Sequence, residues 1–373
     1  MKMRKQINRV VISGGGTGGH IFPAIAIANE IKKRNPQVSI LFVGAEGKME
    51  MERVPQAGYE ITGLPIVGFQ RKLSFSNFLL PFKLLKSLLK ARSVLKNNDP
   101  ELVVGVGGYA SGPTLKMAQL LGIPTVIQEQ NSFPGKTNIL LSKKAKLICT
   151  AYSGLEQFFS LSKIRLTGNP VREELSPSSL TRVEALKVFD LEASRKTILV
   201  IGGSLGARTL NEALSGSIEA ISKSNIQVIW QCGKGYYQAL LNANLDLPKH
   251  IKLLPFISRM DAAYTAADVV ISRAGALSVS ELCLIGKATI LVPSPNVAED
   301  HQTKNAMALV ANKAALMVKD RDAVKSLVQT IFDLLNDKEQ VNKLSENIKK
   351  LAKPNATKEI IDACETIINN DEE

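Results

Sequence analysis

Residues 269–292, VVISRAGALSVSELCLIGKATILV, contain the pattern that decides the fold class. An apolar, β-branched strand opens the stretch, a short turn around Gly275 follows, a helix is expected from about Ser278, and a second apolar strand ends at Val292. A strand, a helix and a parallel strand in this order form one unit of a doubly wound sheet, which binds ligands at the carboxyl ends of its strands. The stretch therefore predicts an α/β fold with a ligand site at the turn.

Ser278 and Glu281 allow two interpretations. Their spacing fits a capping box, in which both side chains bind backbone N–H groups at the start of a helix. The same turn offers backbone N–H groups to a phosphate, and a carboxylate one turn later, at Glu281, suits a ribose diol. Taken alone, the spacing favours the cap, whereas the other motifs of the chain favour the ligand site.

The length of 373 residues, 45% of them hydrophobic, suits two domains. Residues 170–179, rich in Pro and Ser, are the best linker candidate, so we expect domains at 1–173 and 174–350 and a C-terminal helix, 351–373, that packs back toward the first domain. The sequence has no apolar run of about eighteen residues to span a membrane, and its basic start leads into a strand rather than an export signal. Four widely spaced cysteines fit buried thiols in a reducing compartment.

The net charge of +13 comes from the first half of the chain. Residues 1–173 contain 24 Lys/Arg and 10 Asp/Glu, a net +14, whereas residues 174–373 contain 23 and 24, a net −1. A basic half favours a polyanionic partner, either nucleic acid or an anionic membrane surface. Few aromatic residues stand among the basic ones in a stacking pattern, which argues against nucleic acid.

The first half opens with a strand at residues 9–13, the loop GGGTGGH at 14–20 and a helix from Phe22 to about Arg34. The glycines satisfy the GxGxxG spacing of a dinucleotide fold, but strand two ends at Gly44 instead of the acidic residue that a nicotinamide-dependent oxidoreductase needs. The loop is not a P-loop, because His20 stands where Lys would be required. His20 is predicted to act in catalysis or to contact a ligand.

Residues 61–98 contain seven Lys/Arg and no Asp/Glu. A helix from Pro81 to about Lys96 would carry leucines on one side and lysines opposite or beside them: Leu84, Leu85, Leu88, Leu89 and Leu95 against Lys83, Lys86 and Lys90. This helix could face the core with a solvated basic face, but the preceding Phe75 and Phe78 are hard to bury. We therefore favour a peripheral contact with an anionic membrane, to which each basic residue contributes about 1 kcal/mol.

The second half restarts with a strand at 197–201, the loop GGSLGA at 202–207 and a helix from about Arg208. Ser204 matches a nucleophile elbow, which would make the protein a serine hydrolase. We discount this function, because the elbow belongs to a single large sheet and not to the first strand of a second domain. A hydroxyl in a glycine loop at a helix start equally suits a diphosphate.

Seven motifs follow one another along the chain: GGGTGGH (14–20), GVGGY (105–109), QEQN (128–131), GNPVR (168–172), GGSLGAR (202–208), ALSVSE (276–281) and HQTKN (301–305). Together they resemble the bacterial peptidoglycan glycosyltransferases, which add N-acetylglucosamine to an undecaprenyl-diphosphate-linked muramyl peptide. Each motif is weak by itself, but the ordered set spans essentially the whole chain and is specific.

The resemblance implies the GT-B architecture, in which two Rossmann-like domains flank a cleft, UDP-N-acetylglucosamine binds mainly to the second domain and the lipid acceptor to the first. Ile257 would contact uracil through its backbone and Glu281 the ribose hydroxyls. The implied donor-binding residues are Thr17, Gly18, Gly19, Asn131, Arg172, Ser204, Ile257, Ala276, Leu277, Ser278, Val279, Ser280, Glu281, His301 and Gln302. The acceptor or membrane residues are Gly107, Gly108, Tyr109, Phe75, Phe78, Lys83, Lys86 and Lys90.

The implied reaction inverts the anomeric carbon. His20 is the candidate base for the acceptor 4-hydroxyl, since the ordinary pKa of histidine lies near neutrality; Glu129 is the alternative. No metal and no cofactor are expected, because no Asp-x-Asp pair is placed to bridge a metal and a diphosphate, and helix-start dipoles would stabilise the departing UDP.

The resemblance also implies a place in cell-wall synthesis, and hence in cell shape and division. The expected partners are UDP-N-acetylglucosamine, the lipid-linked muramyl peptide, an anionic membrane surface and other cell-wall enzymes, without nucleic acid. The expected location is peripheral, on the cytoplasmic face of the cell membrane. Another GT-B UDP-sugar transferase with a lipid acceptor is the alternative function.

Overall fold

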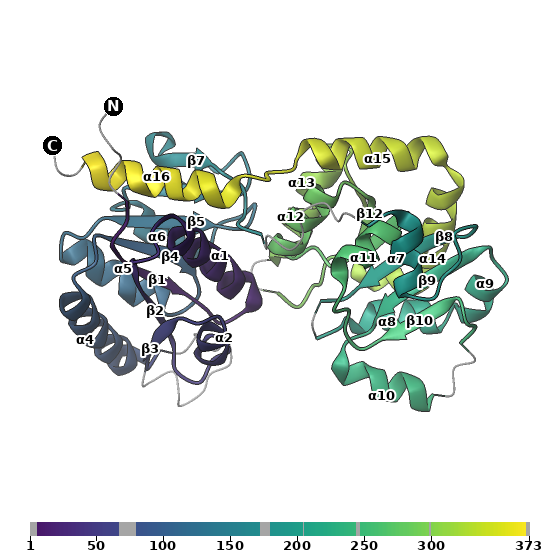
Figure 1. Cartoon of the computed structure of the whole chain (residues 1–373), viewed down its shortest axis with the longest axis horizontal. Coiled ribbons are helices and arrows are strands. Elements are labelled where there is room, and N and C mark those ends of the chain that lie inside the picture. Colours follow the sequence, from purple (N-terminus) through teal and green to yellow (C-terminus); the bar gives the residue numbers. More distant parts are fainter. Residues whose placement is uncertain are drawn as a thin grey trace. The chain divides into compact units, whose positions relative to one another are not determined.

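The computed structural model describes residues 6–66, 80–171, 180–203, 205–243, 247–297 and 300–370. The chain divides into two compact units, whose helices and strands are labelled in Figure 1: unit 1 comprises Met1–Arg172 and Asn355–Glu373, and unit 2 comprises Glu173–Pro354. Each unit contains one parallel sheet with helices on both of its faces. The predicted α/β class with two doubly wound parallel sheets is therefore confirmed.

The sheet of unit 1 has the order β3-β2-β1-β4-β5-β6-β7. Its central strands are buried on both faces, as is typical of parallel sheets: Val10 and Ile12 of β1 join one core cluster, and Val11 joins the other. The strands are β1 (Arg9–Gly14), β2 (Ser39–Ala45), β3 (Glu60–Leu64), β4 (Leu102–Gly107), β5 (Thr125–Glu129), β6 (Leu147–Thr150) and β7 (Ile164–Leu166).

Helices α1 and α16 contribute to the first of these clusters, and α4, α5 and α6 to the second, so they cover opposite faces of the sheet. The helices of unit 1 are α1 (Gly18–Arg34), α2 (Glu50–Gln56), α4 (Leu80–Asn98), α5 (Ser111–Leu120), α6 (Lys136–Ser142), the 3₁₀ turn η1 (Leu161–Lys163) and α16 (Ala356–Asn370). Helix α16, yellow in Figure 1, returns to unit 1 from the end of the chain.

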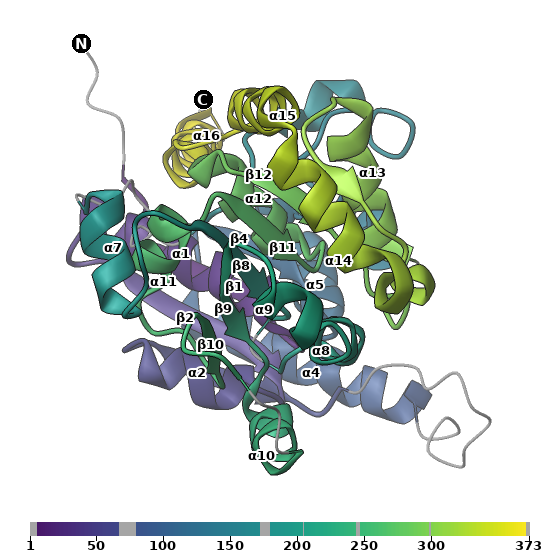
Figure 2. The same cartoon turned by 90° about the vertical axis from the view of Figure 1, so that its right-hand side faces the viewer.

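Unit 2 repeats the arrangement with the order β10-β9-β8-β11-β12-β13. The strands are β8 (Lys196–Ile201), β9 (Ile226–Gln231), β10 (Ile251–Leu254), β11 (Val269–Ser272), β12 (Ala288–Leu291) and β13 (Leu316–Met317). The helices are α7 (Arg182–Val188), α8 (Arg208–Ser215), α9 (Ile218–Ser222), α10 (Lys234–Asn242), α11 (Met260–Ala266), α12 (Ala276–Ile285), α13 (His301–Ala311), α14 (Asp320–Asn336) and α15 (Lys338–Lys350). Figure 2 shows α8 and α14 side by side, and both pack into one core cluster with the sheet.

In each sheet, successive strands of the chain are added first toward one edge and then toward the other, and the change occurs at one pair of neighbouring strands. In unit 1 the strands on one side of β1 are β2 and β3, and those on the other begin with β4; in unit 2 the corresponding pair is β8 and β11. Ligands of doubly wound sheets bind at such switch points, beyond the carboxyl ends of the strands. A ligand site is therefore expected at the loops after β1, β4, β8 and β11.

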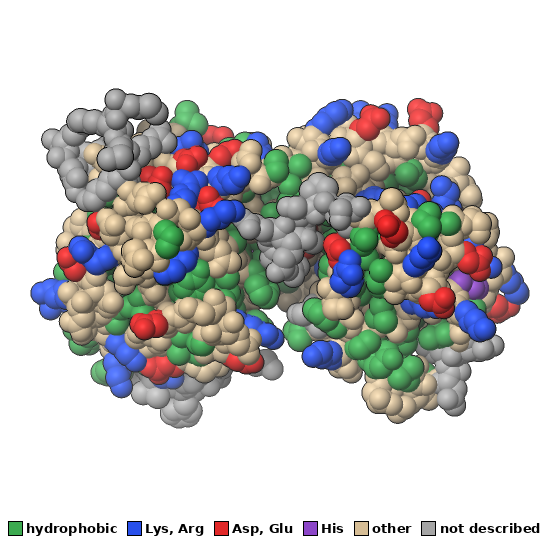
Figure 3. Space-filling view, viewed as in Figure 1, with side chains coloured by type: hydrophobic (Ala, Val, Ile, Leu, Met, Phe, Trp, Pro, Cys, Tyr) green, Lys and Arg blue, Asp and Glu red, His purple; other side chains and the backbone are tan. Residues whose placement is uncertain are grey.

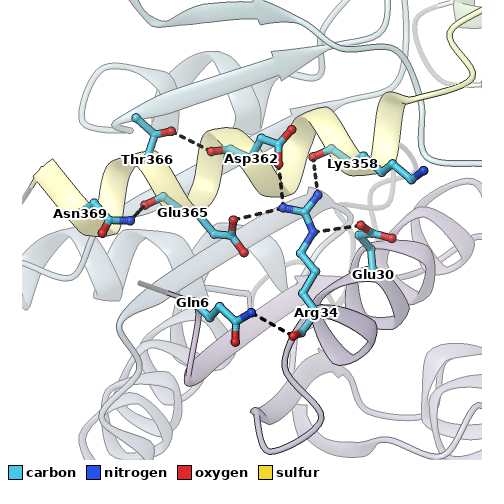
Figure 4. Close-up of polar contacts among 8 residues, drawn as sticks. All are labelled: Gln6, Glu30, Arg34, Lys358, Asp362, Glu365, Thr366 and Asn369. Atoms are coloured by element: carbon cyan, nitrogen blue, oxygen red, sulfur yellow. Dashed lines mark hydrogen bonds and ion pairs between the residues drawn. The ribbon is translucent and has the colours of Figure 1, made fainter. Parts of the chain in front are cut away.

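Helix α16 also makes polar contacts with unit 1 through one guanidinium, which Figure 4 shows. Arg34, at the end of α1, donates to Glu30 at 2.9 Å, to Asp362 at 2.7 Å, to Glu365 at 3.1 Å and to the carbonyl of Lys358 at 3.1 Å. The Arg34 side chain is only 21% exposed. Loss of this shared guanidinium would leave partly buried carboxylates without a cation, which is destabilising.

The leucine stripe of α4 does not face the core, which was the alternative to a membrane contact. The buried positions are Ser87, Ala91 and Leu95, whereas Leu84, Leu85 and Leu89 are 44%, 57% and 59% exposed. The helix packs against α5. Hydrophobic periodicity indicated the helix correctly, and the core-facing alternative holds only at Leu95.

Candidate active site

His20 lies in the first turn of α1, because this helix begins at Gly18 rather than near Phe22. Its Nδ1 atom lies 3.0 Å from the carbonyl oxygen of Gly15 and 3.4 Å from Oγ1 of Thr17. A carbonyl oxygen can only accept a hydrogen bond, so Nδ1 carries the proton and Nε2 of the neutral ring carries the lone pair. The ring is thus set in the tautomer in which Nε2 can act as a base.

The glycines after β4 make room for this ring. A β-carbon at Gly107 would lie 2.8 Å from Cδ2 and 2.9 Å from Nε2 of His20, and one at Gly108 would lie 2.3 Å from the Gly15 oxygen. Both glycines have positive φ angles, +93° and +90°, which side-chain-bearing residues rarely adopt. Gly15 also donates to the Gly107 carbonyl at 3.3 Å. The loops after β1 and β4 therefore meet closely at the switch point.

Tyr109, the last predicted acceptor residue of this loop, is 50% exposed and lies beside the glycine loop. Its ring is 3.9 Å from the position of a β-carbon at Gly16. A half-exposed aromatic ring at this point suits contact with a sugar or a lipid-linked acceptor.

Glu129, the alternative base, ends β5 and is 2% exposed. Its carboxylate accepts hydrogen bonds from the Asn131 N–H at 3.0 Å, the Gly135 N–H at 3.3 Å and the Asn138 amide at 2.7 Å. Burial raises the pKa of Glu129, and these donors oppose that rise. Both carboxylate oxygens of Glu129 therefore hold the loop that contains Asn131.

In unit 2, the capping box that was one interpretation of Ser278 and Glu281 does not form. Helix α12 begins at Ala276 with Gly275 as its N-cap, so Ser278 is already its third residue and Glu281 follows one turn further on. The first N–H groups of a helix have no partner within that helix and can bind an anion. Ala276, Leu277 and Ser278 occupy this first turn, which supports the ligand interpretation of the motif.

Val279 and Ser280, which are also predicted donor-binding residues, follow in the same helix. Val279 is 2% exposed and packs into the core, and the Ser280 hydroxyl donates to the Ala276 carbonyl at 3.0 Å. The side chain of Ile257, which follows β10, is likewise buried, so a contact to uracil would fall to its backbone.

Gln302 connects the start of α13 to the α12 loop. Its Oε1 atom accepts the N–H of Ala274 at 3.2 Å and the N–H of Ser294 at 2.9 Å. Two N–H donors fix which end of the amide is the oxygen, so the NH₂ group of Gln302 is the end that can reach a sugar hydroxyl. His301 precedes it as the first residue of α13.

Sequence analysis missed Arg273 and Glu50. Arg273 donates to the Val292 carbonyl at 2.9 Å and pairs with Asp320. It therefore connects the loop after β11 to the end of β12 and to the start of α14. Glu50 is fully buried beneath the glycine loop and accepts the N–H of Gly16 at 2.8 Å. No local sequence signal marks either residue, because their partners are backbone groups or residues distant along the chain.

Four predicted residues lie outside the described part of the chain: Arg172, Ser204, Phe75 and Phe78. The loop that contains Ser204 is closely packed at its end, where a β-carbon at Gly206 would lie 2.0 Å from the Cys232 carbonyl oxygen. Among the described residues, no group of three or more His, Cys, Asp or Glu side chains is placed to hold a metal ion. In that same part of the chain, no helix has the length and apolar character needed to cross a bilayer.

The sequence is similar to those of known glycosyltransferases. Residues 10–150 match the glycosyltransferase family 28 N-terminal domain, and residues 197–360 match the glycosyltransferase family 28 C-terminal domain. The chain is 54% identical to the UDP-N-acetylglucosamine–N-acetylmuramyl-(pentapeptide) pyrophosphoryl-undecaprenol N-acetylglucosamine transferase of Flavobacterium psychrophilum, over 95% of this chain and 96% of that protein. It is also 54% identical to the protein of the same name from Parabacteroides distasonis, over 98% and 100%.

Solved structures of glycosyltransferases also superpose on this chain. The crystal structure of Acinetobacter baumannii MurG superposes with a TM-score of 0.78 at 31% identity and covers 95% of this chain and 99% of that one. The calicheamicin glycosyltransferase, at 15% identity and a TM-score of 0.69, covers 96% of this chain and 98% of its own and shares the fold alone. By sequence over nearly its full length, the chain belongs to the MurG family of bacterial peptidoglycan N-acetylglucosaminyltransferases, within glycosyltransferase family 28.

Proposed function

We propose that this protein transfers N-acetylglucosamine from UDP-N-acetylglucosamine to the 4-hydroxyl of undecaprenyl-diphosphate-N-acetylmuramoyl-pentapeptide, a step of peptidoglycan synthesis. The chain is a UDP-N-acetylglucosamine-dependent hexosyltransferase by family membership. The observation that carries the mechanism is the 3.0 Å contact between His20 Nδ1 and the Gly15 oxygen, since it leaves Nε2 as the base.

In this mechanism Nε2 of His20 takes the proton of the acceptor hydroxyl as that oxygen attacks the anomeric carbon of the donor sugar. The bond from the sugar to UDP breaks on the opposite side, so the configuration inverts. The first turn of α12 and the Gln302 amide hold the donor in unit 2, and the helix dipole stabilises the negative charge that builds up on the diphosphate. Glu281 accepts hydrogen bonds from the ribose.

The test is transfer of radiolabelled N-acetylglucosamine to a short-chain analogue of the lipid-linked acceptor. His20→Ala is expected to lower kcat by about 10²- to 10⁴-fold, the usual contribution of a positioned base. Glu281→Ala is expected to raise the KM for the donor about tenfold or more, because it removes a charged hydrogen-bond acceptor. His250→Ala, which changes a histidine outside the assigned sites, is the control. Full activity of His20→Ala would move the base to another residue.

We also propose that α4 contacts the cytoplasmic face of the cell membrane, where the lipid acceptor resides and where other enzymes of cell-wall synthesis act. Phe82, Leu85 and Leu89 are 69%, 57% and 59% exposed, and Lys86 and Lys90 stand on the same helix. On the face drawn in Figure 3, the blue basic side chains of the described residues are interspersed with red acidic ones and form no continuous basic patch. The support for the proposal is therefore the exposed apolar side chains of α4 next to Lys86, whereas Lys90 is paired with Glu46 at 2.9 Å.

This second proposal is tested by sedimentation with lipid vesicles. The double variant Lys83→Glu, Lys86→Glu is expected to weaken binding to anionic vesicles about tenfold or more, since each charge near the surface contributes about 1 kcal/mol. The same reversal at Lys338 and Lys343, which are exposed on α15, is the control. Equal binding by both double variants would exclude α4 as the membrane contact.

A further inference from the structure

The carboxylate of Glu50 is buried without a cation. Glu50 is the first residue of α2 and is 0% exposed. One oxygen accepts the N–H of Ala45 at 3.0 Å and the other accepts the N–H of Gly16 at 2.8 Å. Buried charges are normally paired with an opposite charge, whereas the hydrogen bonds that the described residues give to the Glu50 carboxylate come from backbone N–H groups. Two backbone N–H groups take the place of a cation.

The peptide group between Gly15 and Gly16 connects this carboxylate to His20. Its N–H donates to Glu50, and its carbonyl oxygen accepts from Nδ1 of His20 at 3.0 Å. A peptide that donates to a carboxylate becomes a stronger acceptor at its oxygen, because hydrogen bonds in a chain polarise one another. The Glu50 carboxylate and the glycine loop are closely packed, since a β-carbon at Gly15 would lie 2.2 Å from Oε1 of Glu50.

We propose that Glu50 is a positioning residue for the catalytic histidine and acts on it through the Gly15–Gly16 peptide group. This inference rests on the proposed role of His20 as the base. In the serine protease triad a buried carboxylate contacts the histidine directly, fixes its tautomer and stabilises the imidazolium; here one peptide group stands between them. No proton reaches Glu50. When the acceptor O–H bond breaks, the proton forms a bond to Nε2, and Nδ1 keeps its own proton and its contact to Gly15.

The alternative is that Glu50 only fills space beneath the loop. Glutamine at position 50 separates the two roles, because it has nearly the same shape but no charge, and it presents an NH₂ group to one of the two N–H donors. If Glu50 only fills space, the Glu50→Gln protein should transfer sugar with the wild-type kcat. A positioning role predicts an altered His20 even when the protein is folded.

The experiment uses the full chain labelled with ¹⁵N-histidine. Only three histidines are present, so the ring signals of His20 are assigned by comparison with His20→Ala. We expect His20 to be mainly the Nδ1–H tautomer in the wild type and a mixture of tautomers in Glu50→Gln. In the transfer assay we expect kcat to fall about tenfold, as is usual when the partner that orients a functional histidine is lost, with an unchanged KM for the donor.

Glu30→Gln is the matched control. Glu30 is 7% exposed and lies on α1, the helix that carries His20, but its carboxylate pairs with Arg34. We expect it to lower stability without changing the His20 tautomer or kcat. Glu50→Asp, which keeps the charge on a shorter side chain, serves if Glu50→Gln does not fold, and is expected to shift both readouts in the same direction by less.

A folded Glu50→Gln protein with the wild-type tautomer and the wild-type kcat would overturn the inference. The tautomer is measured without substrate, so the two proposals fail separately. A changed tautomer in a protein whose wild type transfers no sugar would refute the proposed function and leave the coupling between Glu50 and His20 intact.

Discussion

Replacing Gly107 by alanine tests whether the position of the His20 ring controls the reaction. The new β-carbon would lie 2.8 Å from Cδ2 of the ring, whereas ordinary contacts begin at 3.4 Å, so the ring must move by about 0.6 Å. A displacement of about 1 Å in a reacting group costs about 100-fold in rate. We therefore expect kcat for sugar transfer to fall roughly 10- to 50-fold, with an unchanged affinity of the protein for UDP measured by calorimetry.

The variant also places alanine at a φ of +93°, which costs about 1–2 kcal/mol of folding stability. Gly122→Ala controls for that cost, because Gly122 has a φ of +78° and no atom within 4 Å of its β-carbon position. We expect both variants to lose similar stability in thermal unfolding, and only Gly107→Ala to lose turnover. Equal kcat values for the two variants would show that the ring position does not matter and would refute the reasoning.

Two further predictions concern stability. Arg34→Met leaves the carboxylates of Glu30 and Glu365, each 7% exposed, without their cation. We expect it to lower the unfolding free energy of unit 1 by about 3 kcal/mol and to leave the affinity for UDP unchanged. An unchanged melting temperature would contradict this prediction. The pKa of His250 is held below its ordinary value of 6.5, first by burial and then by Arg195. The unfolded state therefore binds more protons, so this contribution to stability is present above pH 6.5 and is lost as the pH falls through the lowered pKa. In urea unfolding below pH 6.5, His250→Gln should lose less stability than the wild type, and parallel curves would exclude this assignment.

Local sequence patterns predicted the elements of the site well. The β-branched strands, the glycine loops and the polar residues after them indicated two doubly wound sheets, and the order of the motifs indicated the family. These features are readable because they depend on neighbours in the chain: apolar runs form buried parallel strands, and glycines permit positive φ angles. The same locality explains why Ser278-x-x-Glu281 allowed two interpretations, since it has the spacing of a capping box although the helix begins two residues earlier.

The face that a helix buries and the partners of a buried polar group were decided by tertiary structure. On α4 most of the leucine stripe is exposed whereas Ser87, Ala91 and Leu95 are buried, because the side of a helix that meets its neighbours depends on the fold and not on hydrophobicity alone. The sequence alone determined that His20 follows a glycine loop at a helix start. Only the fold determined which of its nitrogens carries the proton, because the Gly15 carbonyl, the space left by Gly107 and the carboxylate of Glu50 are brought together from three separate segments of the chain.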